Sequence, residues 1–244
     1  MNKYAPAETR AAAFEYFKDK ADKALKNNKL DEFNEMLGLL LGRFTVAADN
    51  SIKDAEEKNE IMEYLVSVGT PAIETIKNFI NKSHVVAYPI EVLFRLLNKE
   101  AVLDFLEGTI TTETTLFDDA LVEKRIEVLK HFAGETHPNM LSKTLTYLND
   151  PDDRLVIAAI RFIQEYIFDK SDDLGPVQDL MINKYLDPET SMRIKIELLN
   201  VFINKEWKVA GHKKQFEELL PEGYFINAQG YLRVINNAVK AREN

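Results

Sequence analysis

Apolar residues recur along most of this chain with the spacing of three and four that places side chains on one face of a helix. In segment 70–81, Pro71 lies in the first helical turn and is followed by apolar residues at Ile73, Ile76, Phe79 and Ile80. The same spacing predicts four helices of about four turns each, at 51–68, 117–133, 152–168 and 188–204. The sequence therefore predicts an all-α protein.

Segment 223–235 is the one place where a strand competes with a helix. Its sequence, GYFINAQGYLRVI, could form a β-hairpin around Asn227–Gly230. The spacing of Leu232, Ile235 and Val239 favours a last helix instead, and we predict that helix.

The apolar spacing also recurs as a unit. Asp150-Pro151 is followed by Leu155, Ala159, Phe162 and Tyr166, and 37 residues later Asp187-Pro188 is followed by Met192, Ile196, Leu199 and Ile203. Earlier segments repeat the spacing with Val86, Ile90, Leu93 and Leu97, with Val122, Ile126, Leu129 and Ala133, and more faintly with Ile61, Tyr64 and Val68. We expect these residues to form the buried faces of successive helices.

Each of these units is the second helix of a predicted pair. The first helices of the pairs are predicted at 31–48, 71–81, 100–107, 138–148 and 175–186. A helix pair cannot bury its apolar face alone, so neighbouring pairs are expected to stack. We predict a single α-solenoid domain over 1–244, a right-handed superhelix of about five helix pairs with a capping helix at each end. Its parts are an N-terminal cap helix at 1–30, helix pairs at 31–69, 70–98, 99–134, 135–169 and 170–205, and a C-terminal cap at 206–244.

Two stretches of the chain resemble HEAT repeats. YLVSVGTPAIETIKNFI resembles the join between repeats, and YLNDPDDRLVIAAIRFI resembles the turn within a repeat with its second helix. The likeness covers about 30–210 and implies a curved α-solenoid that serves mostly as a scaffold or adaptor. In that family a turn aspartate and an arginine six residues later, in the second helix, often form a ladder of contacts between repeats. Asp187 and Arg193 have this spacing, but Val156 stands at the equivalent position of the preceding repeat.

The composition excludes several classes of site and partner. The chain has 244 residues, no cysteine and a net charge of −9, so disulfides and thiolate metal sites are excluded. A surface of that sign repels phosphate backbones, and we do not expect nucleic acid to bind. No apolar run is long enough to cross a bilayer, and the N-terminus lacks the apolar core of a signal peptide. A cytoplasmic location is therefore expected.

The acidic turn around Pro151 could hold catalytic carboxylates or helix caps. Asp150, Asp152 and Asp153 lie between two predicted helices, where short acidic side chains accept hydrogen bonds from free N–H groups. The Asp-Pro-acid triplet recurs at 187–189, and turns are duplicated with repeats more readily than catalytic pairs. We predict that these carboxylates only turn the chain.

Three other candidate features also favour structural roles. The segment 169–175 resembles a calcium loop, but Leu174 and Leu180 replace the glycine and the bidentate glutamate, so we expect the cap of a helix that begins near Gly175. His131 and His137 are separated by helix-breaking residues, which leaves no fixed zinc-binding face. Trp207 is expected to cover the end of the core. We therefore predict no catalytic, metal or cofactor site, and no cofactor.

The leading hypothesis is a non-enzymatic scaffold that binds a protein partner through the concave surface of its second helices. The candidate contact residues are the polar ones outside the apolar pattern, namely Arg95, Arg125, Arg161, Glu165 and Lys195. The alternative is a HEAT-like DNA-binding enzyme, such as a DNA glycosylase for alkylated bases. The acidic charge of the chain argues against that alternative, because such an enzyme needs a basic face.

Overall fold

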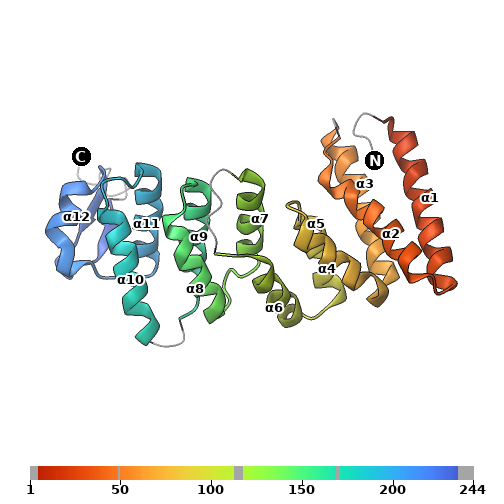
Figure 1. Cartoon of the computed structure of the whole chain (residues 1–244). Helices are drawn as coiled ribbons and strands as arrows, with labels where there is room; N and C mark the ends of the chain where they lie inside the picture. Colours follow the sequence, from red (N-terminus) through yellow and green to blue (C-terminus); the bar gives the residue numbers. More distant parts are fainter. Residues whose placement is uncertain (1–4, 49, 113–117, 169–170, 236–244) are drawn as a thin grey trace. The chain divides into compact units, whose positions relative to one another are not determined.

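A computed structural model describes residues 5–48, 50–112, 118–168 and 171–235, with no description of side chains at 171–173. This part of the chain is mostly helical, as predicted, with one short pair of strands (Figure 1). Its α-helices are α1 (Ala7–Lys26), α2 (Leu30–Leu41), α3 (Ser51–Val68), α4 (Ile73–Lys82), α5 (Ala87–Leu96), α6 (Lys99–Thr109), α7 (Asp119–Lys130), α8 (Pro138–Thr146), α9 (Asp153–Glu165), α10 (Ser171–Leu186), α11 (Met192–Asn204) and α12 (Lys213–Leu219). The 3₁₀ helices are η1 (Gly42–Thr45), η2 (Thr70–Ala72), η3 (Tyr147–Asn149) and η4 (Ala210–His212).

The contacts divide the chain into two compact units. The N-terminal unit comprises Met1–Ile110 and Asp118–Glu127, and the C-terminal unit comprises Thr111–Phe117 and Val128–Asn244. The division falls within α7. The predicted single array over 1–244, with its five pairs, stays a prediction, and each unit is described by itself.

In the N-terminal unit, each of the first three helices packs against the helix that follows its immediate neighbour in the chain. α1 contacts both α2 and α3, α2 contacts α4, and α3 contacts α5. The core between them contains Leu37 and Leu40 of α2, Leu65 of α3 and Ile76 of α4, all fully buried. On α5, the predicted apolar residues Ile90 and Leu93 are likewise buried.

The C-terminal unit repeats this type of packing. α9 contacts α11, and α10 contacts α11 and α12. Helix α9 is apolar nearly all round, and its buried residues are Leu155, Val156, Ile157, Ala159, Ile160, Phe162 and Ile163. Such a helix has neighbours on most of its circumference.

The acidic turn before α9 has the structural role that its sequence predicts. The Asp150 carboxylate accepts a hydrogen bond from the Asp152 backbone N–H at 2.9 Å. Asp152 is the N-cap of α9, and its carboxylate accepts a hydrogen bond from the Arg154 N–H at 2.8 Å. The carboxylates hold the turn and start the helix.

The second acidic turn matches the first only in part. The Asp187 carboxylate accepts a hydrogen bond from the Glu189 N–H at 2.9 Å, just as Asp150 does from Asp152. The N-cap of α11, however, is Ser191, which lies 39 residues after Asp152. Two additional residues therefore separate the second turn from its helix. Among the described residues, neither Asp187 nor Arg193 forms an ion pair, and the Asp187 carboxylate contacts only Glu189 and Thr190 of its own turn, so the ladder between repeats that the family suggests is not formed there.

This difference changes which face of α11 is buried. The 37-residue shift predicted Met192, Ile196, Leu199 and Ile203 on the inner face. Leu199 is fully buried as predicted, but Met192 and Ile196 are 55% and 38% exposed. The buried residues of α11 are Ile194, Lys195, Leu198, Leu199, Val201 and Phe202. Because α11 carries apolar residues on several sides, the spacing alone allows two inner faces, and the longer turn selects one. Ala133, also predicted inside, is exposed beyond the end of α7.

The prediction of a helix over 223–235 is wrong. Strands β1 (Tyr224–Ile226) and β2 (Leu232–Val234) form an antiparallel hairpin in which Ile226 pairs with Leu232. The Asn227 side chain accepts hydrogen bonds from the Gln229 and Tyr231 N–H groups at 3.0 and 2.9 Å, which closes the turn. Gly230 has a φ of +86°, and a Cβ there would lie 2.7 Å from the Cβ of Ala210. Val239, part of the same prediction, lies outside the described residues.

Two smaller predictions have opposite outcomes. Helix α10 begins at Ser171 and includes Pro176, so it starts before Gly175, the predicted position, while residues 169 and 170 lie outside the described residues. Trp207 is 4% exposed and packs edge-on against Phe168 and Phe202, which confirms that it covers the end of the core.

Candidate functional site

Two of the five predicted contact residues link helices that lie two places apart in the chain. The Arg95 guanidinium on α5 donates to both carboxylate oxygens of Glu63 on α3, at 2.7 and 2.8 Å. Arg161 on α9 pairs with Glu197 on α11 at 2.6 Å, with 62% of its own side chain exposed. Each pair fixes a charged group at the surface of its unit.

The other three residues lie in different surroundings. Glu165 is exposed in the last turn of α9. Arg125 and Lys195 are buried, with 1% and 6% of their surface exposed, and the Lys195 ammonium lies 5.9 Å from the centre of the Tyr185 ring. We withdraw Arg125 and Lys195 as contact residues because their side chains are covered by the fold. Their long aliphatic parts allow such packing, which a polar pattern does not reveal.

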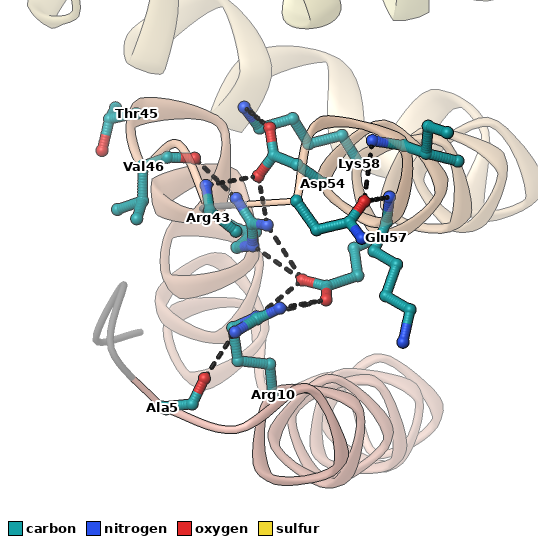
Figure 2. Close-up of polar contacts among 12 residues, drawn as sticks. Ala5, Arg10, Arg43, Thr45, Val46, Asp54, Glu57 and Lys58 are labelled. Atoms are coloured by element: carbon teal, nitrogen blue, oxygen red, sulfur yellow. Dashed lines mark hydrogen bonds and ion pairs between the residues drawn. The ribbon is translucent and has the colours of Figure 1, made fainter.

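A cluster of buried cations and half-buried carboxylates joins three helices of the N-terminal unit (Figure 2). Arg43 of η1, 1% exposed, lies between two acids of α3, with Nη2 at 2.6 Å from Asp54 and 2.9 Å from Glu57. Arg10 of α1 reaches the same Glu57 at 2.6 Å, and Lys58 binds Asp54 at 2.7 Å. We call these five residues the charge cluster.

The side chains of the charge cluster also form hydrogen bonds with backbone groups near the ends of helices. Arg43 Nη1 donates to the Val46 carbonyl at 2.6 Å, and the Ala48 N–H donates to Asp54 at 2.9 Å. Arg10 donates to the Ala5 carbonyl, which ties the start of α1 to the cluster (Figure 2). Removing one partner from such a group is strongly destabilising, because it leaves another buried charge uncompensated.

The charge cluster keeps its acids ionised. Burial raises the pKa of Asp54, but hydrogen bonds from Lys58, Arg43 and the Ala48 N–H outweigh it and lower the pKa to about 2. The hydrogen bond from Arg10 lowers the pKa of Glu57 against the opposing effect of burial, with Arg43 adding to the decrease. Carboxylates of this kind are poor proton donors near neutral pH, so the cluster is suited to holding helices together.

Sequence patterns did not identify the charge cluster, because its partners are distant in the chain. Arg10 and Glu57 are 47 residues apart, and Arg43 precedes Glu57 by 14. The acids Asp54 and Glu57 and the base Lys58 occur within about one turn of α3, and this spacing was the available signal in the sequence. That spacing is also found on ordinary solvated helix surfaces, so it does not distinguish a buried cluster.

Lys124 of α7 is a second buried charge that the sequence did not reveal. It is 4% exposed, and its ammonium donates to the carbonyls of Ile80 and Asn81 at 2.5 and 3.3 Å. Burial lowers its pKa. Because those carbonyls belong to the last turn of α4, Lys124 acts as a remote cap of that helix.

An open groove of about 710 Å³ lies between α1 and α3, on the N-terminal unit. Its lining residues are Phe14, Glu15, Lys18, Glu56, Asn59, Glu60, Glu63, Tyr64 and Ser67. We call it the α1–α3 groove. It includes Glu63, which forms an ion pair with the predicted contact residue Arg95 of α5. Its lining carries four carboxylates and one ammonium.

The described residues place no group of three or more histidine, aspartate or glutamate side chains that could hold a metal ion. Within the same residues, no helix is both long and apolar enough to cross a bilayer.

Comparisons of this chain with protein-family models, with curated proteins and with solved structures find no match. The HEAT-like assignment therefore stays a prediction that depends on the sequence patterns and the packing described above.

Proposed function

We propose that this protein is a non-enzymatic scaffold of HEAT-like helix pairs that binds a protein partner through the exposed surface of its second helices. The packing of α3 on α5 and of α9 on α11 supports this proposal. Contact between helices two places apart is the arrangement by which repeats share a core. A stack of that kind presents a broad, rigid surface to a partner.

The observation that carries the proposal is the pair of surface links between second helices. Arg95–Glu63 and Arg161–Glu197 join residues 32 and 36 positions apart, close to the length of one helix pair. Exposed ion pairs contribute little to stability. They do hold charged groups at defined positions, which gives a binding surface electrostatic specificity.

A double substitution tests this surface. The variant Arg161→Ala with Glu165→Ala removes one positive and one negative group from α9, and we expect roughly tenfold weaker binding of a purified partner. The partner is first identified by capture on tagged wild-type protein and mass spectrometry. Binding is then measured by calorimetry, with the melting temperature recorded for each variant.

The control removes the same two charges from another helix. Lys214→Ala with Glu218→Ala alters exposed residues of α12, a helix outside the second-helix surface. This control is expected to bind as wild type does. Equal loss of binding in both variants, or a loss of stability well above about 1 kcal/mol in the first variant alone, would contradict the proposed surface.

The alternative, a DNA-binding enzyme, is tested by a gel shift with duplex DNA at low salt. A scaffold for proteins gives no shift, whereas a DNA-binding enzyme gives a shift that weakens as salt is added.

A further inference from the structure

The α1–α3 groove has an aromatic floor. The rings of Phe14 and Tyr64 meet edge to face, with centroids 6.2 Å apart. The Tyr64 hydroxyl donates to Asp22 at 2.8 Å, which holds its ring in place, and burial raises the pKa of that hydroxyl with help from the Asp22 carboxylate. Aromatic faces of this kind attract cations.

The walls of the groove are acidic. Glu56, Glu60 and Glu63 line it from α3, and Glu15 lines it from α1. Arg95 neutralises Glu63, but no ion pair engages Glu56 or Glu60 among the residues that the structure describes. Two exposed carboxylates beside an aromatic floor therefore carry negative charge that the fold does not balance.

The chain's own Lys18 shows which group suits this environment. Its ammonium lies 5.8 Å from the Phe14 ring centre, 5.9 Å from that of Tyr64, and 3.7 Å from the Glu15 carboxylate. One ammonium thus already contacts both rings and a carboxylate of the groove. The volume of about 710 Å³ leaves room for further groups of the same chemistry.

We propose that the α1–α3 groove binds a basic segment of a partner protein, with lysine or arginine side chains between the aromatic floor and Glu56 and Glu60. The charge complementarity of the groove argues for this occupant. The acidic lining repels phosphates, which excludes nucleic acid at this site. From Glu56 to Ser67 the groove follows about three turns of α3, roughly 16 Å, a length that about five extended residues span. The inference rests on the proposed scaffold function and names the chemistry of its partner.

The experiment uses the full chain and a fluorescent octapeptide of alternating lysine and glycine, with a glutamate–glycine octapeptide for comparison. Fluorescence anisotropy gives the dissociation constant at low and at high salt. We expect the lysine peptide alone to bind, with an affinity that decreases as salt increases. Glu56→Gln with Glu60→Gln is expected to weaken this binding roughly fivefold, since two exposed charge contacts are lost.

A charge-matched variant separates the groove from the general acidity of the protein. Glu35→Gln with Glu218→Gln alters the net charge by the same amount, from −9 to −7, at exposed residues of α2 and α12 outside the groove. We expect this variant to bind the lysine peptide as wild type does. Phe14→Leu keeps every charge and is expected to weaken binding through loss of the cation–π contact alone.

Three outcomes would overturn the groove assignment: no binding of the lysine peptide at low salt, equal weakening in both glutamine variants, or unchanged binding in Phe14→Leu. These results can be distinguished from a failure of the scaffold function. If partner binding depends on Arg161 and Glu165 but lysine-peptide binding is unchanged by Glu56→Gln with Glu60→Gln, the scaffold function is supported and the groove assignment is wrong.

Discussion

The beginning of the N-terminal unit and the end of the C-terminal unit close their cores by opposite means. At the start, α1, η1 and α3 are joined by the charge cluster, centred on Arg43. At the end, aromatic rings close the core: Phe216 of α12 stacks on Tyr185 with centroids 4.4 Å apart, and it meets Phe202 edge to face at 5.6 Å. Trp207 also packs edge to face against Phe202, with centroids 6.0 Å apart.

The comparison shows what each kind of closure requires. Aromatic packing depends on shape and buried area, so it responds little to pH and fails when a cavity opens. A buried charge cluster depends on every partner and on its ionisation, because one missing group leaves another charge uncompensated. The charged closure also leaves the α1–α3 groove beside it, whereas the aromatic closure buries Phe216 completely.

The largest effect is expected at the aromatic end. Phe216→Ala removes a ring that is 0% exposed and leaves a cavity between Tyr185 and Phe202, with a loss of about 4 kcal/mol in the free energy of unfolding. Denaturant unfolding followed by Trp207 fluorescence and by circular dichroism measures this loss. Phe216→Leu fills part of the cavity and is expected to lose less. Equal losses in the two variants would contradict packing as the source of stability here.

A slightly smaller effect is expected in the charge cluster. Arg43→Ala takes one cation from both Asp54 and Glu57 and one donor from the Val46 carbonyl. We expect a loss of about 3 kcal/mol in the free energy of unfolding, since both carboxylates keep one other cation and some solvent. Circular dichroism during urea unfolding measures it.

Arg161→Ala serves as the matched control for Arg43→Ala. It also removes an ion-paired arginine, but one that is 62% exposed, and it is expected to lose less than about 1 kcal/mol. If the two arginine variants lose the same stability, burial is not what gives the charge cluster its strength.

The smallest effect, a dependence on pH, separates the two ends most sharply. The folded-state pKa of Asp54, about 2, is below its ordinary value of 3.8. Ionised Asp54 therefore stabilises the fold fully above about pH 4, and this contribution is lost as the pH falls through about 2. We expect the stability deficit of Asp54→Asn to be constant from neutral pH to about pH 4 and to shrink below it.

Urea unfolding at several pH values measures these deficits. The deficit of Phe216→Ala should stay constant over the same range, because no charge is involved. A pH-independent deficit in Asp54→Asn would show that the carboxylate acts through its shape and hydrogen bonds and not through its charge.

The sequence by itself determined the secondary structure of most of the chain and the role of its acidic turn. Helix α3 has the bounds predicted from apolar spacing, and Asp152 caps α9, as its position before an apolar run indicates. These features are local. A helix cap depends on backbone groups only two or three residues away, and a helix face depends on a period of 3.6 residues. Both can therefore be recognised in a short stretch of sequence.

Only the tertiary structure decided what depends on distant partners. The hairpin at 223–235 forms where Gly230 packs against Ala210, and α11 buries Leu198 instead of Ile196 because two more residues precede its cap. Arg10 and Arg43 are inside because Glu57 meets them from another helix. Periodicity records which residues are polar, but whether a polar group is solvated or buried depends on the charge that the fold brings beside it.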